Sequence, residues 1–189
     1  MVLEQKLETT RAMESVLKIP GRWAGRFIWA SIVQGLFSVI WTAFIVSPWT
    51  TPAASRVIAA GSAGTWLFVG YSLYLMVGVV AVAVTALFYF FIEGIQGKTF
   101  TGAAGGLAWA HLLLMNIGVA GATWIMMYGG YAGGAALLPT QAGGGGLDAG
   151  QVHVQILGSL PNYIAAFVLL AMVGALLGGL GYLVVSRRK

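Results

Sequence analysis

His111 is the residue of this sequence whose type and position are best suited to chemistry. It lies in the stretch from Leu107 to Tyr131, which contains no Lys, Arg, Asp or Glu. A helix of this length crosses a hydrocarbon core of about 30 Å, because each residue adds about 1.5 Å. An ionisable side chain inside such a helix marks a candidate functional site. His111 therefore has two interpretations: a cofactor contact, as a haem ligand, quinone partner or proton carrier, or a structural hydrogen bond between helices.

The other polar side chains around His111 do not assemble into an active site. Asn116 lies about 140° around the helix from His111, so the two face different neighbours, and we expect Asn116 to bond the backbone of an adjacent helix. His153 is the only other histidine and falls in a later loop with Asp148, which we interpret as solvated. The sequence contains no cysteine and no cluster of metal-ligating residues. It predicts no catalytic centre and no metal site in this chain, while membership of an oxidoreductase complex stays open.

The composition predicts that His111 is carried by a helix in a membrane. The chain has 189 residues, of which 59% are apolar and 8% charged, and its mean hydropathy is +0.87. Ordinary soluble domains are about 25% charged. We therefore predict an all-α integral membrane protein with one transmembrane domain of four helices, residues 27–189. Its spans are expected at about 27–47, 65–92, 104–131 and 161–185, with a Gly-rich outer loop at 132–160.

Two further segments lie outside the spans. Residues 1–26 are predicted to be a retained cytoplasmic or interfacial segment. Residues 3–18 have two interpretations: a short amphipathic helix on the membrane surface, or a solvated tail that a partner orders in part. In the outer loop, polar and apolar residues alternate from Gln151 to Leu157, which predicts a short extended segment.

The distribution of basic residues predicts the orientation. Four spans place both termini on one side of the membrane, and nine of the ten Lys and Arg residues lie on that side. Only Arg56 lies on the other side, together with Asp148. Because cytoplasmic loops are enriched in Lys and Arg, we expect both termini in the cytoplasm.

Small and polar residues in the spans predict how the helices pack. Glycines at a spacing of four, or near it, let two helices approach closely in lipid. A mid-span amide is costly in lipid and is expected to face another helix. The predicted packing residues are Gly118, Gly121, Gly174, Gly178, Gly181, Gln34 and Asn116.

Two stretches resemble a known membrane family. The run from Ala108 to Val119, continuing to Met126–Tyr131, is similar to a late transmembrane helix of subunit I of the haem–copper oxidases and nitric-oxide reductases. The segment from Pro161 to Lys189 resembles the last helix of that subunit. The resemblance covers about residues 103–189. Those subunits have about twelve spans and six metal-ligating histidines, whereas this chain has four predicted spans and two histidines. The resemblance therefore implies a small accessory subunit or a reduced relative in an oxidase assembly, and it gives His111 no ligand role.

We therefore expect a non-catalytic integral membrane subunit of a respiratory electron-transfer complex, a haem–copper terminal oxidase, in a prokaryotic plasma membrane. Its partners would be other integral membrane subunits and lipids, with haem and copper held by a partner subunit and none in this chain. Residues 132–160 would help an outer electron donor to dock. Two alternatives stay open: a quinone-linked oxidoreductase membrane subunit with His111 at the quinone pocket, or a small transporter or channel protomer, for which a charged or broken mid-span site would be expected.

Overall fold

The computed structural model describes residue 5 and residues 22–188 of the chain. The amphipathic helix predicted for residues 3–18 therefore lies outside the described residues, except for Gln5. The elements in chain order are α2 (Arg22–Val46), α3 (Ala54–Ala59), η1 (Ser62–Gly64), α4 (Thr65–Leu73), η2 (Tyr74–Ala81), α5 (Val82–Phe90), η3 (Phe91–Ile95), α6 (Ala103–Leu137), η4 (Thr140–Ala142), α7 (Ala149–Val152), η5 (His153–Leu157) and α8 (Leu160–Ser186).

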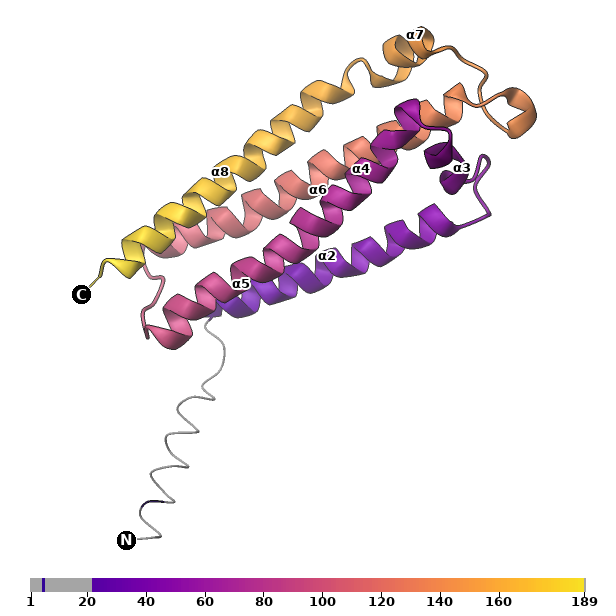
Figure 1. Ribbon diagram of the computed structural model, residues 1–189. Coiled ribbons are helices and arrows are strands. Elements are labelled where there is room, and N and C mark those ends of the chain that lie inside the picture. The colour runs from indigo at the N-terminus through magenta and orange to yellow at the C-terminus, as the bar shows by residue number, and fades with distance from the viewer. Residues whose placement is uncertain (1–4, 6–21, 189) are drawn as a thin grey trace.

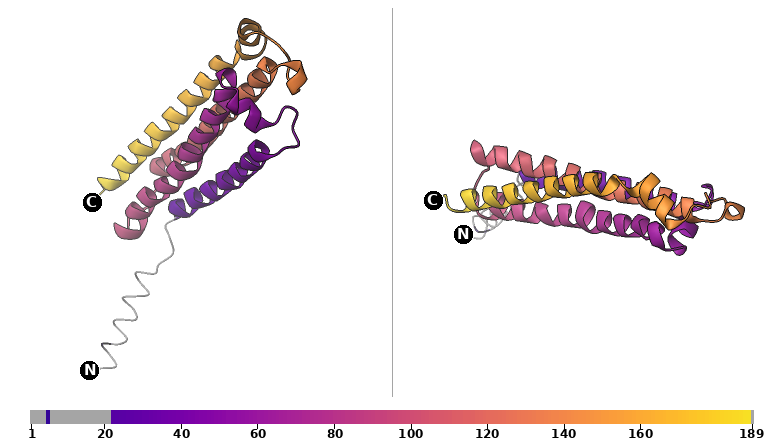
Figure 2. Two further views of the ribbon diagram at one scale, coloured as in Figure 1. Left: turned by 45° about the vertical axis from the view of Figure 1, so that its right-hand side comes forward. Right: turned by 90° about the horizontal axis from the view of Figure 1, so that it is seen from above.

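Four helices of the described chain are long and apolar enough to cross a membrane. They are Arg22–Val46, Ser62–Ile95, Ala103–Leu137 and Leu160–Ser186. The second of these is continuous from η1 to η3 and includes two stretches with π-helical hydrogen bonding, η2 and η3. Figures 1 and 2 show the four long helices side by side, with the start of α2 and the C-terminus at one end and α3 and α7 at the other.

Helix α6 is the centre of this arrangement. It packs along α8 on one side and against α4 on another, while α2 packs mainly on η2 and α5. The outer helices α2 and α8 are therefore each covered mainly by one neighbour. Their remaining surfaces are apolar and exposed, as at Leu36 (63% exposed) and Leu176 (66% exposed).

The third long helix runs further than the sequence suggested. We expected it to end near Tyr131, because the glycines that follow lower helix propensity. It continues to Leu137, since Gly130, Gly133 and Gly134 are buried where α6 meets the start of the second helix. Burial of the glycine backbone against a neighbouring helix offsets the low propensity.

The loop after α6 is also more helical than expected. The extended segment predicted over Gln151–Leu157 is wrong, because these residues form the second half of α7 and all of η5. Asp148 begins this helix: its side chain accepts a hydrogen bond from the Gln151 backbone N–H at 2.8 Å, and its own N–H donates to Gln151 Oε1 at 3.0 Å. This reciprocal pair satisfies two donors at the helix start, so the local sequence favours a helix over a strand.

Candidate functional site

His111 forms a buried pair with Tyr89. The imidazole Nδ1 on α6 lies 3.1 Å from the Tyr89 hydroxyl on α5, and the two side chains are 7% and 4% exposed. Within the described chain, the Tyr89 hydroxyl has no other hydrogen-bond partner. A buried O–H that does not donate is costly, so we assign the proton of this bond to Tyr89 and the imidazole proton to Nε2.

Aromatic rings hold this pair between three helices. The Phe27 ring of α2 stacks on Tyr89 with centroids 4.7 Å apart and planes 18° apart. The same ring lies 5.0 Å from the His111 ring centroid. Because α2, α5 and α6 each contribute one ring, the orientation of His111 depends on the packing of all three helices.

The fourth wall of the pair is the backbone of α8. A Cβ atom placed on Gly178 would overlap the His111 imidazole, including Nδ1. Glycines of both helices take part in this contact. A Cβ on Gly174 would lie 2.6 Å from the Met115 backbone nitrogen, and one on Gly118 would lie 2.7 Å from the Phe167 carbonyl oxygen. The α6–α8 contact is thus a close approach of two backbones that only glycine permits.

The remaining small residues predicted to pack lie along the same contact. A Cβ on Gly121 would overlap the Phe167 ring, and one on Gly181 would lie 3.2 Å from Leu107 Cβ. All five predicted glycines therefore lie between α6 and α8.

A cleft of about 520 Å³ opens beside His111 and Tyr89. It runs between α5, α6 and α8, and its wall includes the exposed side chains Phe88 and Leu183. The other lining residues are Thr85, Gly178, Gly179 and Tyr182. A mostly apolar cleft with a few polar groups is typical of sites that bind small molecules.

A second polar cluster lies on a different face of α6, as the angular offset between His111 and Asn116 predicted. Gln34 Nε2 of α2 donates to Asn116 Oδ1 at 3.1 Å, and Asn116 Nδ2 donates to the Leu112 carbonyl at 2.7 Å. The expectation that Asn116 bonds the backbone of a neighbouring helix is wrong: its interhelical partner is a side chain, and the backbone it bonds is its own helix.

Tyr74 completes this cluster. Its hydroxyl donates to Gln34 Oε1 and lies 3.2 Å from the Gln34 backbone oxygen. Gln34 thus has partners for both ends of its amide. Neither Tyr74 nor Tyr89 was singled out from the sequence, because a tyrosine in an apolar run reads equally well as packing.

Other candidate chemistry is dispersed among the described residues. These residues contain no group of three or more His, Cys, Asp and Glu side chains that could hold a metal. His153 lines a separate cavity of about 260 Å³ with Trp66 and Leu137, at the end of the bundle that carries α7.

Comparison with known proteins adds no assignment: no protein-family model, no curated protein and no solved structure matches this chain. The similarity to haem–copper oxidase subunits therefore rests only on the sequence stretches described above.

Proposed function

We propose that this chain is a multi-pass membrane protein that acts as a non-catalytic subunit of a membrane electron-transfer complex by packing against a larger integral membrane subunit. One observation carries the proposal: α2 and α8 are each covered mainly by a single neighbour, and their outer faces are apolar. The polar side chains Gln34 and Ser38 in the middle of α2 are buried, whereas large apolar side chains of the same helix, such as Leu36 and Val39, are exposed. This is the reverse of a water-soluble surface, and it suits contact with lipid or with another helix.

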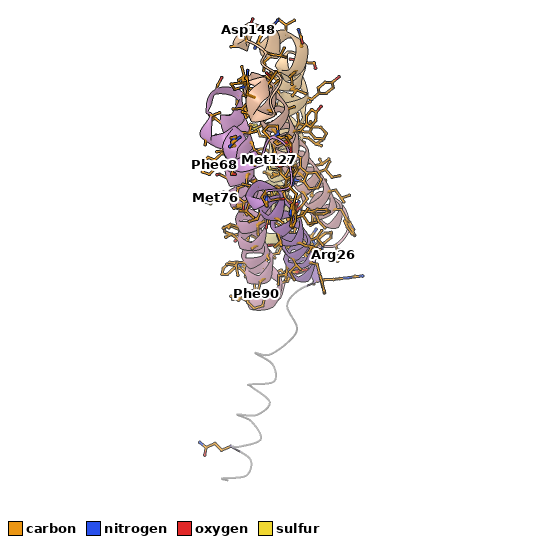
Figure 3. The ribbon with its side chains drawn as sticks, turned by 90° about the vertical axis from the view of Figure 1, so that its right-hand side faces the viewer. Arg26, Phe68, Met76, Phe90, Met127 and Asp148 are labelled. Atoms are coloured by element: carbon orange, nitrogen blue, oxygen red, sulfur yellow. The ribbon has the colours of Figure 1, made fainter. Side chains whose placement is uncertain are left out.

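The charges at the two ends support a cytoplasmic location for the termini. Figure 3 shows Arg26 and Phe90 at one end of the bundle and Asp148 at the other. The end with Arg26 also carries Lys98 and Arg188. The Lys98 side chain donates a hydrogen bond to the Ser186 carbonyl, and the Arg188 side chain donates one to the Thr99 carbonyl. A basic end of this kind favours the cytoplasmic face.

We further propose which complex the chain belongs to. The resemblance over residues 103–189 favours a haem–copper terminal oxidase of a prokaryotic plasma membrane, with haem and copper in the partner subunit. In this complex the chain would contribute helix packing and contact with lipid.

The test is purification of the chain from native membranes in a mild detergent, with mass identification of co-purifying chains and a reduced-minus-oxidised optical spectrum. We expect haem bands and a large membrane subunit. A matched pair of variants locates the contact: Leu176→Trp enlarges the exposed face of α8, and Leu36→Trp enlarges that of α2. A variant that loses the partner but keeps its own thermal stability identifies the docking helix. A colourless chain that purifies alone would refute the proposal.

One observation favours a second function. The cleft beside His111 and Tyr89 is apolar, holds an imidazole whose Nε2 makes no hydrogen bond in the described chain, and borders exposed side chains. These properties suit the ring of a lipid-soluble quinone. His111→Ala would then abolish quinone-dependent activity of the complex while leaving assembly intact. If packing is the role of His111, the same variant would instead reduce assembly.

A further inference from the structure

A second cavity, separate from the His111 cleft, lies at the basic end of the bundle. Its volume is about 500 Å³, and it is bounded by the start of α2, by η3 and by the start of α6. Its polar lining comes from Arg22, Arg26, Glu93, Thr99 and Thr101. Two tryptophans, Trp23 and Trp109, complete the wall. This is the composition of a binding site for a charged group at the boundary of an apolar layer.

Two indole rings orient Arg26, which forms no ion pair with a carboxylate of the described residues. Its guanidinium carbon lies 4.2 Å from the centroid of the Trp23 ring and 4.5 Å from that of Trp109. The two indoles meet edge to face, 5.3 Å apart. Contact with two ring faces fixes the direction of the guanidinium, while its N–H groups make no hydrogen bond or ion pair within the described residues. A positioned cation with free donors is therefore available to an anion.

The one acid of the cavity is already engaged. Glu93 Oε2 accepts a hydrogen bond from the Trp23 backbone N–H at 2.9 Å, so its carboxylate caps the start of α2. Neither Arg22 nor Arg26 forms an ion pair with it, although both attract the carboxylate at longer range. Cationic charge in the cavity thus exceeds anionic charge even with Glu93 ionised.

A third arginine reaches the rim of the cavity. Arg188 Nη1 donates to the Thr99 carbonyl at 3.3 Å and to the Thr101 hydroxyl at 3.4 Å. Lys98 Nζ donates to the Ser186 carbonyl at 2.6 Å. These bonds attach the end of α8 to the loop before α6, and they bring the cation of Arg188 next to the cavity.

We propose that this arginine–tryptophan cavity binds the phosphate group of an anionic phospholipid, with Arg22 and Arg26 as its cations. Guanidinium groups pair strongly with phosphate oxygens. Tryptophan is favoured at the level of lipid head groups, and basic pockets between transmembrane helices on the cytoplasmic side bind anionic head groups. The inference rests on the proposal that the chain spans a membrane, but not on its being a subunit of an oxidase. A free phosphate ion has the same chemistry, so the experiment separates the two sources.

The experiment uses the purified full-length chain in a mild non-ionic detergent. Phosphatidylglycerol and phosphatidylcholine with identical acyl chains are titrated, and binding is read by native mass spectrometry and by the shift of the thermal unfolding midpoint. We expect the protein to retain phosphatidylglycerol in preference to phosphatidylcholine. Arg26→Gln should weaken phosphatidylglycerol binding roughly tenfold or more, since it removes a charge-assisted pair.

Arg187→Gln is the matched control, because it removes the same charge at the same end without lining the cavity. It should bind phosphatidylglycerol as the unmodified chain does. If Arg26→Gln does not fold, Arg22→Gln tests the same cavity from an exposed position at the start of α2.

Three results would overturn the proposal. Equal binding of the two lipids removes the role of the head-group charge, and equal loss in the Arg187 control shows only a diffuse charge effect. A midpoint shift by inorganic phosphate alone, equal to that by phosphatidylglycerol, assigns the cavity to free phosphate instead of lipid. These results concern lipid binding by the isolated chain, whereas the subunit proposal fails only through the co-purification experiment.

Discussion

Gly178→Ala is the substitution that most directly tests the packing of His111. The added methyl group would overlap the imidazole, so either the ring moves and loses its bond to Tyr89 or α8 moves away from α6. Overpacking of a tight contact costs about 1–3 kcal/mol, and loss of the hydrogen bond adds about 1 kcal/mol. We expect the free energy of unfolding to fall by about 2–4 kcal/mol. The assay is thermal and denaturant unfolding of the purified chain in detergent.

Gly179→Ala is the control, since the neighbouring position has nothing within 4 Å of an added Cβ. It should be neutral or slightly stabilising, because alanine favours helix more than glycine does. In the double variant Gly178→Ala with His111→Ala, the methyl group fits the space left by the ring. The two single effects should therefore not add, with a coupling of at least about 1 kcal/mol. Equal stability of the two glycine variants would refute the inferred contact.

Three further predictions concern the same bundle. Tyr89→Phe should destabilise the chain by about 1–3 kcal/mol, because it leaves a buried imidazole nitrogen without its partner. Tyr182→Phe should not, because the Tyr182 hydroxyl has no hydrogen bond in the described chain. Equal thermal unfolding midpoints for the two variants would contradict the pairing of Tyr89 with His111. Gln34→Leu should lower the unfolding midpoint, because it removes the interhelical partner of both an amide and a tyrosine hydroxyl; unchanged stability would show that the network contributes nothing net. Gly134→Ala should separate α6 from the start of the long helix Ser62–Ile95, since the added Cβ would lie 2.7 Å from the Gly64 Cα. Gly106→Ala, also on α6, is the control, because its Cβ meets nothing within 4 Å. Thermal unfolding and protease sensitivity of the adjoining loop would measure the difference.

The long charge-free runs were sufficient to predict the four helices, because an apolar segment of that length is expected to satisfy its backbone polar groups internally, as a helix. The ends of the helices were less predictable. The low helix propensity of Gly133 and Gly134 predicted a loop there. They are helical because they pack against the start of the long helix Ser62–Ile95. The sequence identified His111 as a candidate site, because it is an ionisable residue in a long run without Lys, Arg, Asp or Glu. It did not identify the partner Tyr89, because the register between two antiparallel helices decides which of several aromatic residues meets the imidazole.

The glycines of α6 explain why this helix is central. Gly118 faces α8, whereas Gly130, twelve residues later, faces α4, and a Cβ there would overlap the Leu67 backbone. Twelve residues at about 100° each rotate the helix by about 120°, so the two close contacts lie on different sides and at different depths. In this way α6 approaches both α8 and α4 closely, at separate positions along its length. The polar side chains gather in the angles between these contacts, at His111 and at Asn116, where a neighbouring helix is near enough to supply a partner. The outer faces of α2 and α8 have no such neighbour among the described residues, and they are apolar, as helix faces that contact lipid would be.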